Sequence, residues 1–229
     1  MRIAIVLCML LITSPVLAGT FIDDFEDGNL DGWEESYPWA ARTTWSVENG
    51  ELVGISIHDI GADTHLYLSD SSDWQDYDVS ARVKVTESFT KNICGAGLLV
   101  RQMGRVNYLN FKILMHDQLI GPDVPKARYL WQDNNDWGVL HKEPLDLQFD
   151  VWYDLLLEVS GSHFVFYVDG EKLLDVESTL FDKGEVGVVL NGAEAYYDNF
   201  VVTGDGVPDT STSVESNGKL ATSWGALKH

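Results

Sequence analysis

The chain has 229 residues, of which 36 are acidic and 15 basic, and its formal charge at pH 7 is −21. Its 45% of hydrophobic residues can bury a substantial core, which excludes wholesale disorder, and the length fits one large domain or two small ones. The excess of carboxylates disfavours nucleic acids and anionic membrane surfaces as partners, because both are bound through Lys and Arg, and it leaves a neutral ligand, a cation or another protein.

The first 18 residues have the pattern of a signal peptide. Met1 and Arg2 give a positive start, residues 3–12 form an unbroken apolar run, and residues 16–18 end on the small Ala18 that a signal peptidase reads. About ten apolar residues cannot span a hydrocarbon core of ~30 Å, which disfavours the alternative of a retained membrane anchor. We therefore expect cleavage after Ala18 and a secreted, extracytoplasmic protein that does not insert into the membrane.

After that cleavage Cys94 is the only cysteine, because Cys8 lies within the signal peptide. No internal disulfide can then form, so stability must come from the apolar core and from any bound metal. We expect Cys94 to be a small buried residue at the start of a strand, since no neighbouring histidine offers to generate a nucleophilic thiolate.

Between residues 21 and 203 the apolar residues recur with a period of two, which is the pattern of strands with one buried and one solvent-exposed face. The alternation is clearest in residues 79–85 and 109–115. Asn49-Gly50 and Asp169-Gly170 are strong signals for tight hairpin turns. Because no stretch of helical period separates the strands, the pattern predicts an all-β fold, either an antiparallel sandwich or a barrel.

Residues 204–229 lack this periodicity. Residues 204–213 have the composition of a flexible linker, and the apolar residues of 219–229 are too few to hold a helix alone in water. We expect one domain over residues 19–203 and a C-terminal tail over residues 204–229, with docking to a surface or a protein as an alternative role for the tail.

Several short phrases follow one another along the domain; they are residues 21–25, 30–33, 45–52, 74–79, 152–155, 167–170, 184–188 and 197–200. In this order they resemble the concanavalin A-like lectin and glucanase superfamily, which includes laminin G-like (LamG-like) modules and family 16 glycoside hydrolases. They are also similar to the domain described as 3-keto-disaccharide hydrolase. The resemblance implies a two-sheet antiparallel jelly-roll β-sandwich and a lectin-like, carbohydrate-binding function.

The catalytic motif of the glucanases is missing. Retaining glucanases of this fold carry Glu-x-Asp-x-x-Glu on a central strand, because two carboxylates must flank the glycosidic bond about 5 Å apart. No Glu-x-Asp occurs in the chain. In the segment that would take the central position, strand alternation instead exposes Arg101, Tyr108, Asn110 and Lys112, side chains that bind hydroxyls.

The segment 128–138 has the most ligand-like composition. Aromatic side chains offer flat faces to sugar rings, and amides and charged groups bind hydroxyls. The candidate ligand-binding residues here are Arg128, Trp131, Asp133, Asn134, Asn135 and Trp137. The alternative is a plain hairpin whose two indoles both pack inward. The remaining tryptophans of the phrases are expected in the core: Trp33, Trp45, Trp74 and Trp152.

The resemblance also implies a structural calcium ion that joins the first strand to the last. Its ligands would be Asp24, the carbonyl of Gly50 and Asp198, with Glu26 as an additional ligand, because calcium prefers six to eight oxygens. The alternative is that these carboxylates are solvated or hydrogen-bonded to turns.

We expect an exported carbohydrate-binding module without catalysis, with the concave sheet and the 128–138 loop holding the sugar. One alternative is a sugar-modifying hydrolase or lyase of the 3-keto-disaccharide type, with His116 and Asp117 as an acid/base pair beside the polar face. The other is a cell-surface protein-interaction module, marked by a broad exposed apolar patch and no cleft.

Overall fold

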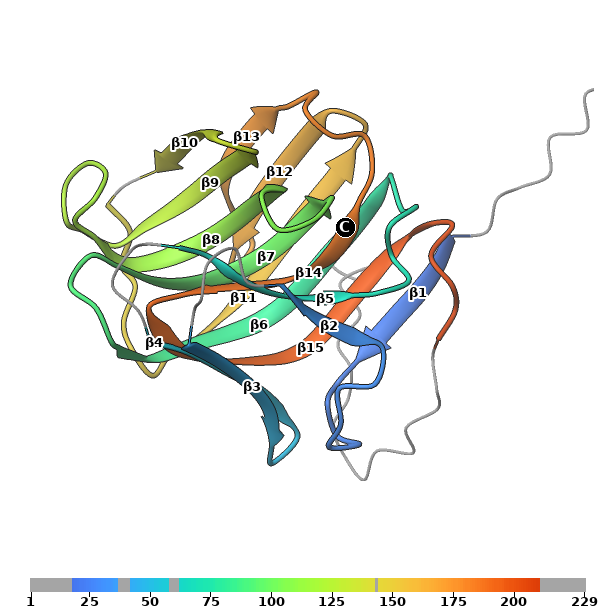
Figure 1. The fold of residues 1–229 in the computed structure, drawn as a ribbon, viewed down its shortest axis with the longest axis horizontal. Coiled ribbons are helices and arrows are strands. Elements are labelled where there is room, and N and C mark those ends of the chain that lie inside the picture. The colour runs from blue at the N-terminus through green and yellow to red at the C-terminus, as the bar shows by residue number, and fades with distance from the viewer. Residues whose placement is uncertain (1–17, 37–41, 58–61, 143, 211–229) are drawn as a thin grey trace, which may run out of the picture.

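A computed structural model describes residues 18–36, 42–57, 62–142 and 144–210. All the regular elements in these ranges are β-strands (Figure 1). They are β1 (Ala18–Asp23), β2 (Trp33–Ser36), β3 (Arg42–Glu48), β4 (Glu51–Ile57), β5 (Thr64–Leu68), β6 (Tyr77–Ser88), β7 (Ile93–Gln102), β8 (Asn107–Asp117), β9 (Lys126–Asp133), β10 (Asp136–Lys142), β11 (Trp152–Ser160), β12 (His163–Val168), β13 (Glu171–Glu177), β14 (Glu185–Asn191) and β15 (Ala193–Asp205). In these ranges no helix is long and apolar enough to cross a membrane.

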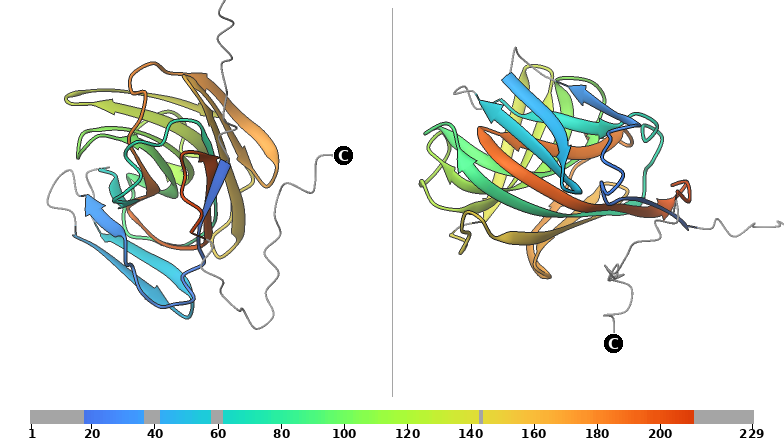
Figure 2. Two further views of the ribbon diagram at one scale, coloured as in Figure 1. Left: turned by 90° about the vertical axis from the view of Figure 1, so that its right-hand side faces the viewer. Right: turned by 90° about the horizontal axis from the view of Figure 1, so that it is seen from below.

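The strands form two antiparallel sheets that face each other across the core (Figure 2). The front sheet has the order β10-β9-β8-β7-β14-β5-β2. The back sheet has the order β13-β12-β11-β6-β15-β4-β3, and β1 pairs with β15. Neither sheet closes on itself, so the fold is the predicted jelly-roll β-sandwich and not a barrel.

Alternation places the core between the sheets, as predicted. On β6, Val79 and Val83 are fully buried, while Asp78 is exposed on the other face. On β8, Phe111 points into the core, where its ring stacks 5.8 Å from that of Phe164 across the sandwich. The predicted turns at Asn49-Gly50 and Asp169-Gly170 are present, with all four residues at positive φ, as tight type I′ hairpins require.

Three of the four tryptophans that were expected in the core do lie there, namely Trp33, Trp45 and Trp74. The expectation for Trp152 was wrong. Its ring lies partly buried on the outer face of the back sheet, between the cations of Arg82 and Lys84, which lie 4.9 and 4.5 Å from the ring centre. Cys94 is buried as expected, and burial raises the pKa of its thiol to about 11, so at neutral pH it is not a nucleophile.

Candidate ligand-binding cleft

A cleft with a volume of about 660 Å³ lies on the outer face of the front sheet, away from the core. Its apolar lining includes Ile93, Leu119, Ile120, Leu130 and Trp137, and its amide lining is Gln132, Asn134 and Asn135. Tyr108 adds an aromatic ring, which packs with Leu99, Leu130 and Val189 in a small apolar cluster outside the main core. The charged side chains of the lining are Asp63, Arg105 and Arg128.

Strand alternation and register bring four of the predicted ligand-binding residues together. Because Phe111 and its odd-numbered neighbours fill the core, Tyr108, Asn110 and Lys112 project from the outer face of β8. Arg128 on β9 pairs directly with Lys112. Tyr108 and Arg128 line the cleft itself, and Asn110 and Lys112 lie fully buried on the same face.

Arg101 does not join this group. Its φ of 55° turns the end of β7 so that the guanidinium lies inside the sandwich, 5.8 Å from the ring of Phe164. There it donates to the carbonyl oxygens of Gln75 at 2.7 Å and Gly161 at 3.1 Å. Arg101 therefore connects the β5–β6 loop with the β11–β12 turn.

Asp63, just before β5, is the centre of a buried polar network beside the cleft. Its carboxylate accepts hydrogen bonds from Lys112 Nζ, from Asn110 Nδ2 at 2.7 Å and from Asn191 Nδ2 at 2.8 Å. The donors on β8 reach it across β7, where Gly97 stands opposite Lys112 and has no side chain to block the path. A Cβ added to Gly97 would lie 2.5 Å from Cβ of Lys112 and 2.2 Å from the carbonyl oxygen of Phe111.

The network keeps Asp63 charged and His65 neutral. Burial alone would raise the pKa of Asp63, but attraction to Lys112 and Arg128 outweighs it and lowers that pKa well below the ordinary range. Burial lowers the pKa of His65 to about 4, against the attraction of Asp63. The neutral imidazole lies edge-on to Tyr108, with ring centres 4.3 Å apart.

Asp117 stabilises the loop between β8 and β9, which forms one side of the cleft. It accepts hydrogen bonds from the backbone nitrogens of Leu119 and Ile120, at 3.0 and 3.1 Å, and pairs with Arg128 Nη1 at 3.3 Å. His116, the other half of the predicted acid/base pair, bonds through Nε2 to Ser88 Oγ at 2.8 Å. The two side chains thus have separate partners, and the structure does not bring them together as a proton-transfer pair.

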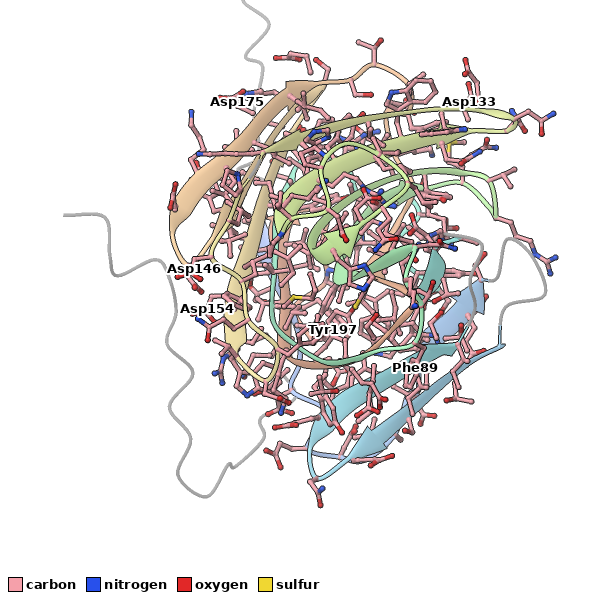
Figure 3. All side chains as sticks on the ribbon, turned by 90° about the vertical axis from the view of Figure 1, so that its left-hand side faces the viewer. Phe89, Asp133, Asp146, Asp154, Asp175 and Tyr197 are labelled. Atoms are coloured by element: carbon pink, nitrogen blue, oxygen red, sulfur yellow. The ribbon has the colours of Figure 1, made fainter. Side chains whose placement is uncertain are left out.

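The β9–β10 hairpin forms another wall of the cleft. Trp137 faces the cleft and is 52% exposed, whereas Trp131 packs against the core, so the two indoles point to opposite sides. Asn134 and Asn135 line the cleft from the turn, where the Asn134 backbone nitrogen donates to Asn107 Oδ1 at 2.9 Å. Asp133 lies at the tip of the hairpin (Figure 3) and accepts from Asn134 Nδ2 at 2.9 Å.

The residues predicted to bind calcium lie away from the cleft, around the back sheet. Asp24 accepts from the backbone nitrogen of Glu26 at 3.3 Å, and the Glu26 carboxylate lies so close to Gly50 that a Cβ added there would be 2.8 Å from it. Asp198 pairs with Arg82 at 3.7 Å. Among the described residues no three His, Cys, Asp or Glu side chains are grouped closely enough to hold a metal ion.

Sequence reasoning missed Asp63, His65, Asn191 and Arg105. Period-two alternation would have placed Asp63 and His65 on one face of a strand, and that was the available signal. Nothing local indicates that this face meets Lys112, because the contact depends on the strand order β8-β7-β14-β5.

A family model described as "3-keto-alpha-glucoside-1,2-lyase-like domain" matches residues 20–203. No curated protein matches the chain.

Among solved structures, the carbohydrate-binding module CBM66 from Bacillus subtilis is similar with a TM-score of 0.58 and 20% identity, covering 74% of this chain and 93% of that one. The VIP36 exoplasmic/lumenal domain in its Ca²⁺/Man2-bound form has a TM-score of 0.57 and 10% identity, covering 84% and 90%. A putative glycosyl hydrolase from Parabacteroides distasonis has a TM-score of 0.54 and 12% identity, covering 82% and 94%. At these identities the likeness establishes the concanavalin A-like fold.

Proposed function

The chain belongs to the 3-keto-alpha-glucoside-1,2-lyase-like domain family, and from this premise we propose that it binds a carbohydrate in the front-sheet cleft without cleaving it. The observation that carries the proposal is the lining of the cleft. The half-exposed indole of Trp137 faces the same space as the amides of Gln132, Asn134 and Asn135. Sugars present an apolar C–H face and a rim of hydroxyls, which match an aromatic platform with planar donors and acceptors beside it.

The carboxylates of the cleft favour binding over hydrolysis. A glycosidase of the usual kind needs two carboxyl groups on either side of the glycosidic bond. Asp63 is the one acidic side chain among the described cleft residues. Its three donors and its lowered pKa make it a weak proton acceptor, suited to orienting Lys112 and the amides.

The second candidate is a sugar-cleaving enzyme of the kind that the family description implies. A lyase acting on a 3-keto-glucoside must take the proton from C2 while the C1–O bond breaks and a C1=C2 double bond forms. The step requires one general base, and the leaving oxygen takes up a proton from that group or from water. The observation that favours this candidate is the Asp63–Lys112 pair next to Tyr108 at the cleft. Incubation with a 3-keto-disaccharide decides it: sugar release by the wild-type protein would establish the enzyme and contradict a purely binding role.

We also propose that a structural calcium ion binds at Glu26, the carbonyl of Gly50 and Asp198, with Asp24 beside them. The support is that the Glu26 carboxylate lies close to Gly50. A carboxylate oxygen and a carbonyl oxygen from two different turns are therefore available as ligands of one ion. Since Asp198 pairs with Arg82, the ion would compete with that guanidinium for one carboxylate. The similar solved structures include the VIP36 exoplasmic/lumenal domain in its Ca²⁺-bound form.

Export after cleavage at Ala18 completes the proposal. The support is the charge and apolar pattern of residues 1–18, of which residues 1–17 lie outside the described part of the chain. N-terminal sequencing of the protein recovered outside the cytoplasm tests it, and a first residue other than Gly19 would contradict this cleavage site.

The binding proposal is tested by electrophoresis in gels that contain single polysaccharides, neutral and acidic. Retardation by at least one of them, abolished by the matching soluble oligosaccharide, is the expected result. No retardation of a correctly folded protein by any of them would contradict the proposal.

A further inference from the structure

Basic side chains gather in the cleft although the chain as a whole is strongly acidic. The formal charge is −21, with 15 basic residues in all. The charged lining nevertheless comprises two arginines, Arg105 and Arg128, against the single carboxylate of Asp63. Asp63 in turn is paired with the buried Lys112, so its charge is compensated within the network.

Arg128 has hydrogen-bonding capacity left over. Its side chain is almost fully buried, at 2% exposure, and a single contact, from Nη1 to Asp117 at 3.3 Å, pairs it with a carboxylate. Its Nε has no hydrogen-bond partner among the described residues. A buried guanidinium donor without a partner costs free energy, and a carboxylate is the acceptor that matches a guanidinium best.

Arg105 is the second arginine of the cleft. It lies exposed in the turn between β7 and β8 and forms no ion pair with any residue in the described ranges, yet its side chain lines the cleft. The two arginines occupy different ends of the cleft. Arg105 lies just before Asn107, where β8 begins. Arg128 pairs with Lys112 of β8, and Lys112 is five residues from Asn107, or roughly 17 Å along the strand at ~3.4 Å per residue.

We propose that the ligand is an acidic oligosaccharide, a chain of uronic acid residues whose carboxylates are bound by Arg128 at one end of the cleft and by Arg105 at the other. This inference rests on the proposed carbohydrate-binding function and names its ligand class. Trp137 and the amides hold the sugar rings, and the arginines select for charge. The distant carboxylates of the protein oppose this only weakly, because at about 0.15 M salt exposed charges more than ~8 Å away are largely screened.

Titration calorimetry of the full chain with paired ligands tests the inference. The probes are a galacturonate hexasaccharide and a mannuronate hexasaccharide, each beside its own full methyl ester, which keeps the shape and loses the charge. At least one of the two acids is expected to bind about tenfold or more tightly than its own ester, with an affinity that falls as salt rises. Arg105→Gln should reduce that preference about tenfold, whereas Lys172→Gln, which removes the same charge from an exposed site on β13, should leave it unchanged.

The outcomes separate the ligand class from the function. Equal binding of acid and ester, or binding of neutral polysaccharides only, overturns the acidic ligand and leaves carbohydrate binding standing. A preference for the acid that Arg105→Gln does not reduce overturns the assignment to the arginines; Arg105 is exposed, so its substitution tests this without risk to the fold. Absence of binding to the uronates and to every polysaccharide in the gels overturns the proposed function as well.

Discussion

Lys112 reaches Asp63 across two intervening strands, β7 and β14, over a position where β7 has only the glycine Gly97. Both side chains are buried, and the amides of Asn110 and Asn191 bond the same carboxylate. The pair therefore connects the start of β5 with β8 and holds the buried side of the cleft in one arrangement.

Removal of either partner should be costly, because it leaves an uncompensated charge in the interior. We expect Lys112→Met and Asp63→Asn each to lower the free energy of unfolding by about 3–5 kcal/mol. The double variant should lose less than the sum of the two, since it leaves neither charge unpaired. Denaturant unfolding of the four proteins measures the cycle. Additive losses would show that the two groups do not stabilise each other.

The stability of the protein should fall in mild acid because of His65. Burial lowers its pKa from 6.5 to about 4, so between these pH values the unfolded chain binds a proton that the folded chain does not. The contribution is fully present above pH 6.5 and is lost as the pH falls towards 4, by an amount on the order of 3 kcal/mol. In urea titrations at pH 7 and pH 4.5, His65→Gln should show a smaller difference than the wild type. An equal difference in both proteins would place the acid sensitivity elsewhere.

Calcium should raise the unfolding temperature if it binds Glu26, Gly50 and Asp198. An ion that binds only the folded state adds about 3 kcal/mol at a hundredfold excess over its dissociation constant, which corresponds to a shift of roughly 5–10 °C for a domain of this size. Thermal unfolding with calcium or with chelator measures the shift, and Asp198→Asn should abolish it. A midpoint that chelator leaves unchanged would contradict the ion.

The two-sheet fold was predictable from sequence because its evidence is local. Alternation along β8 identifies Phe111 as core and Lys112 as outward-facing, and Asn49-Gly50 and Asp169-Gly170 mark their hairpins through backbone conformations that few residues adopt.

The site was predictable only in part, because its key contacts are not local. Tyr108, Asn110 and Lys112 were found by alternation, and Arg128 by the composition of the segment 128–138, which the structure pairs with β8. Arg101 broke the same rule, since its left-handed backbone turns the side chain inward at the end of β7. Asp63 meets Lys112 only because of the strand order, which no period in the sequence encodes.

The measurement that tests the central claim most directly is carbohydrate binding by Trp137→Ala and Trp152→Ala. Both changes remove an indole from the surface of the sandwich, one from the cleft and one from the outer face of the back sheet. Trp137→Ala removes the stacking platform and should bind the polysaccharide that retards the wild-type protein about tenfold or more weakly. Trp152→Ala should bind it like the wild type. Unchanged binding in Trp137→Ala, or an equal loss in Trp152→Ala, would contradict the assignment of the front-sheet cleft as the carbohydrate site.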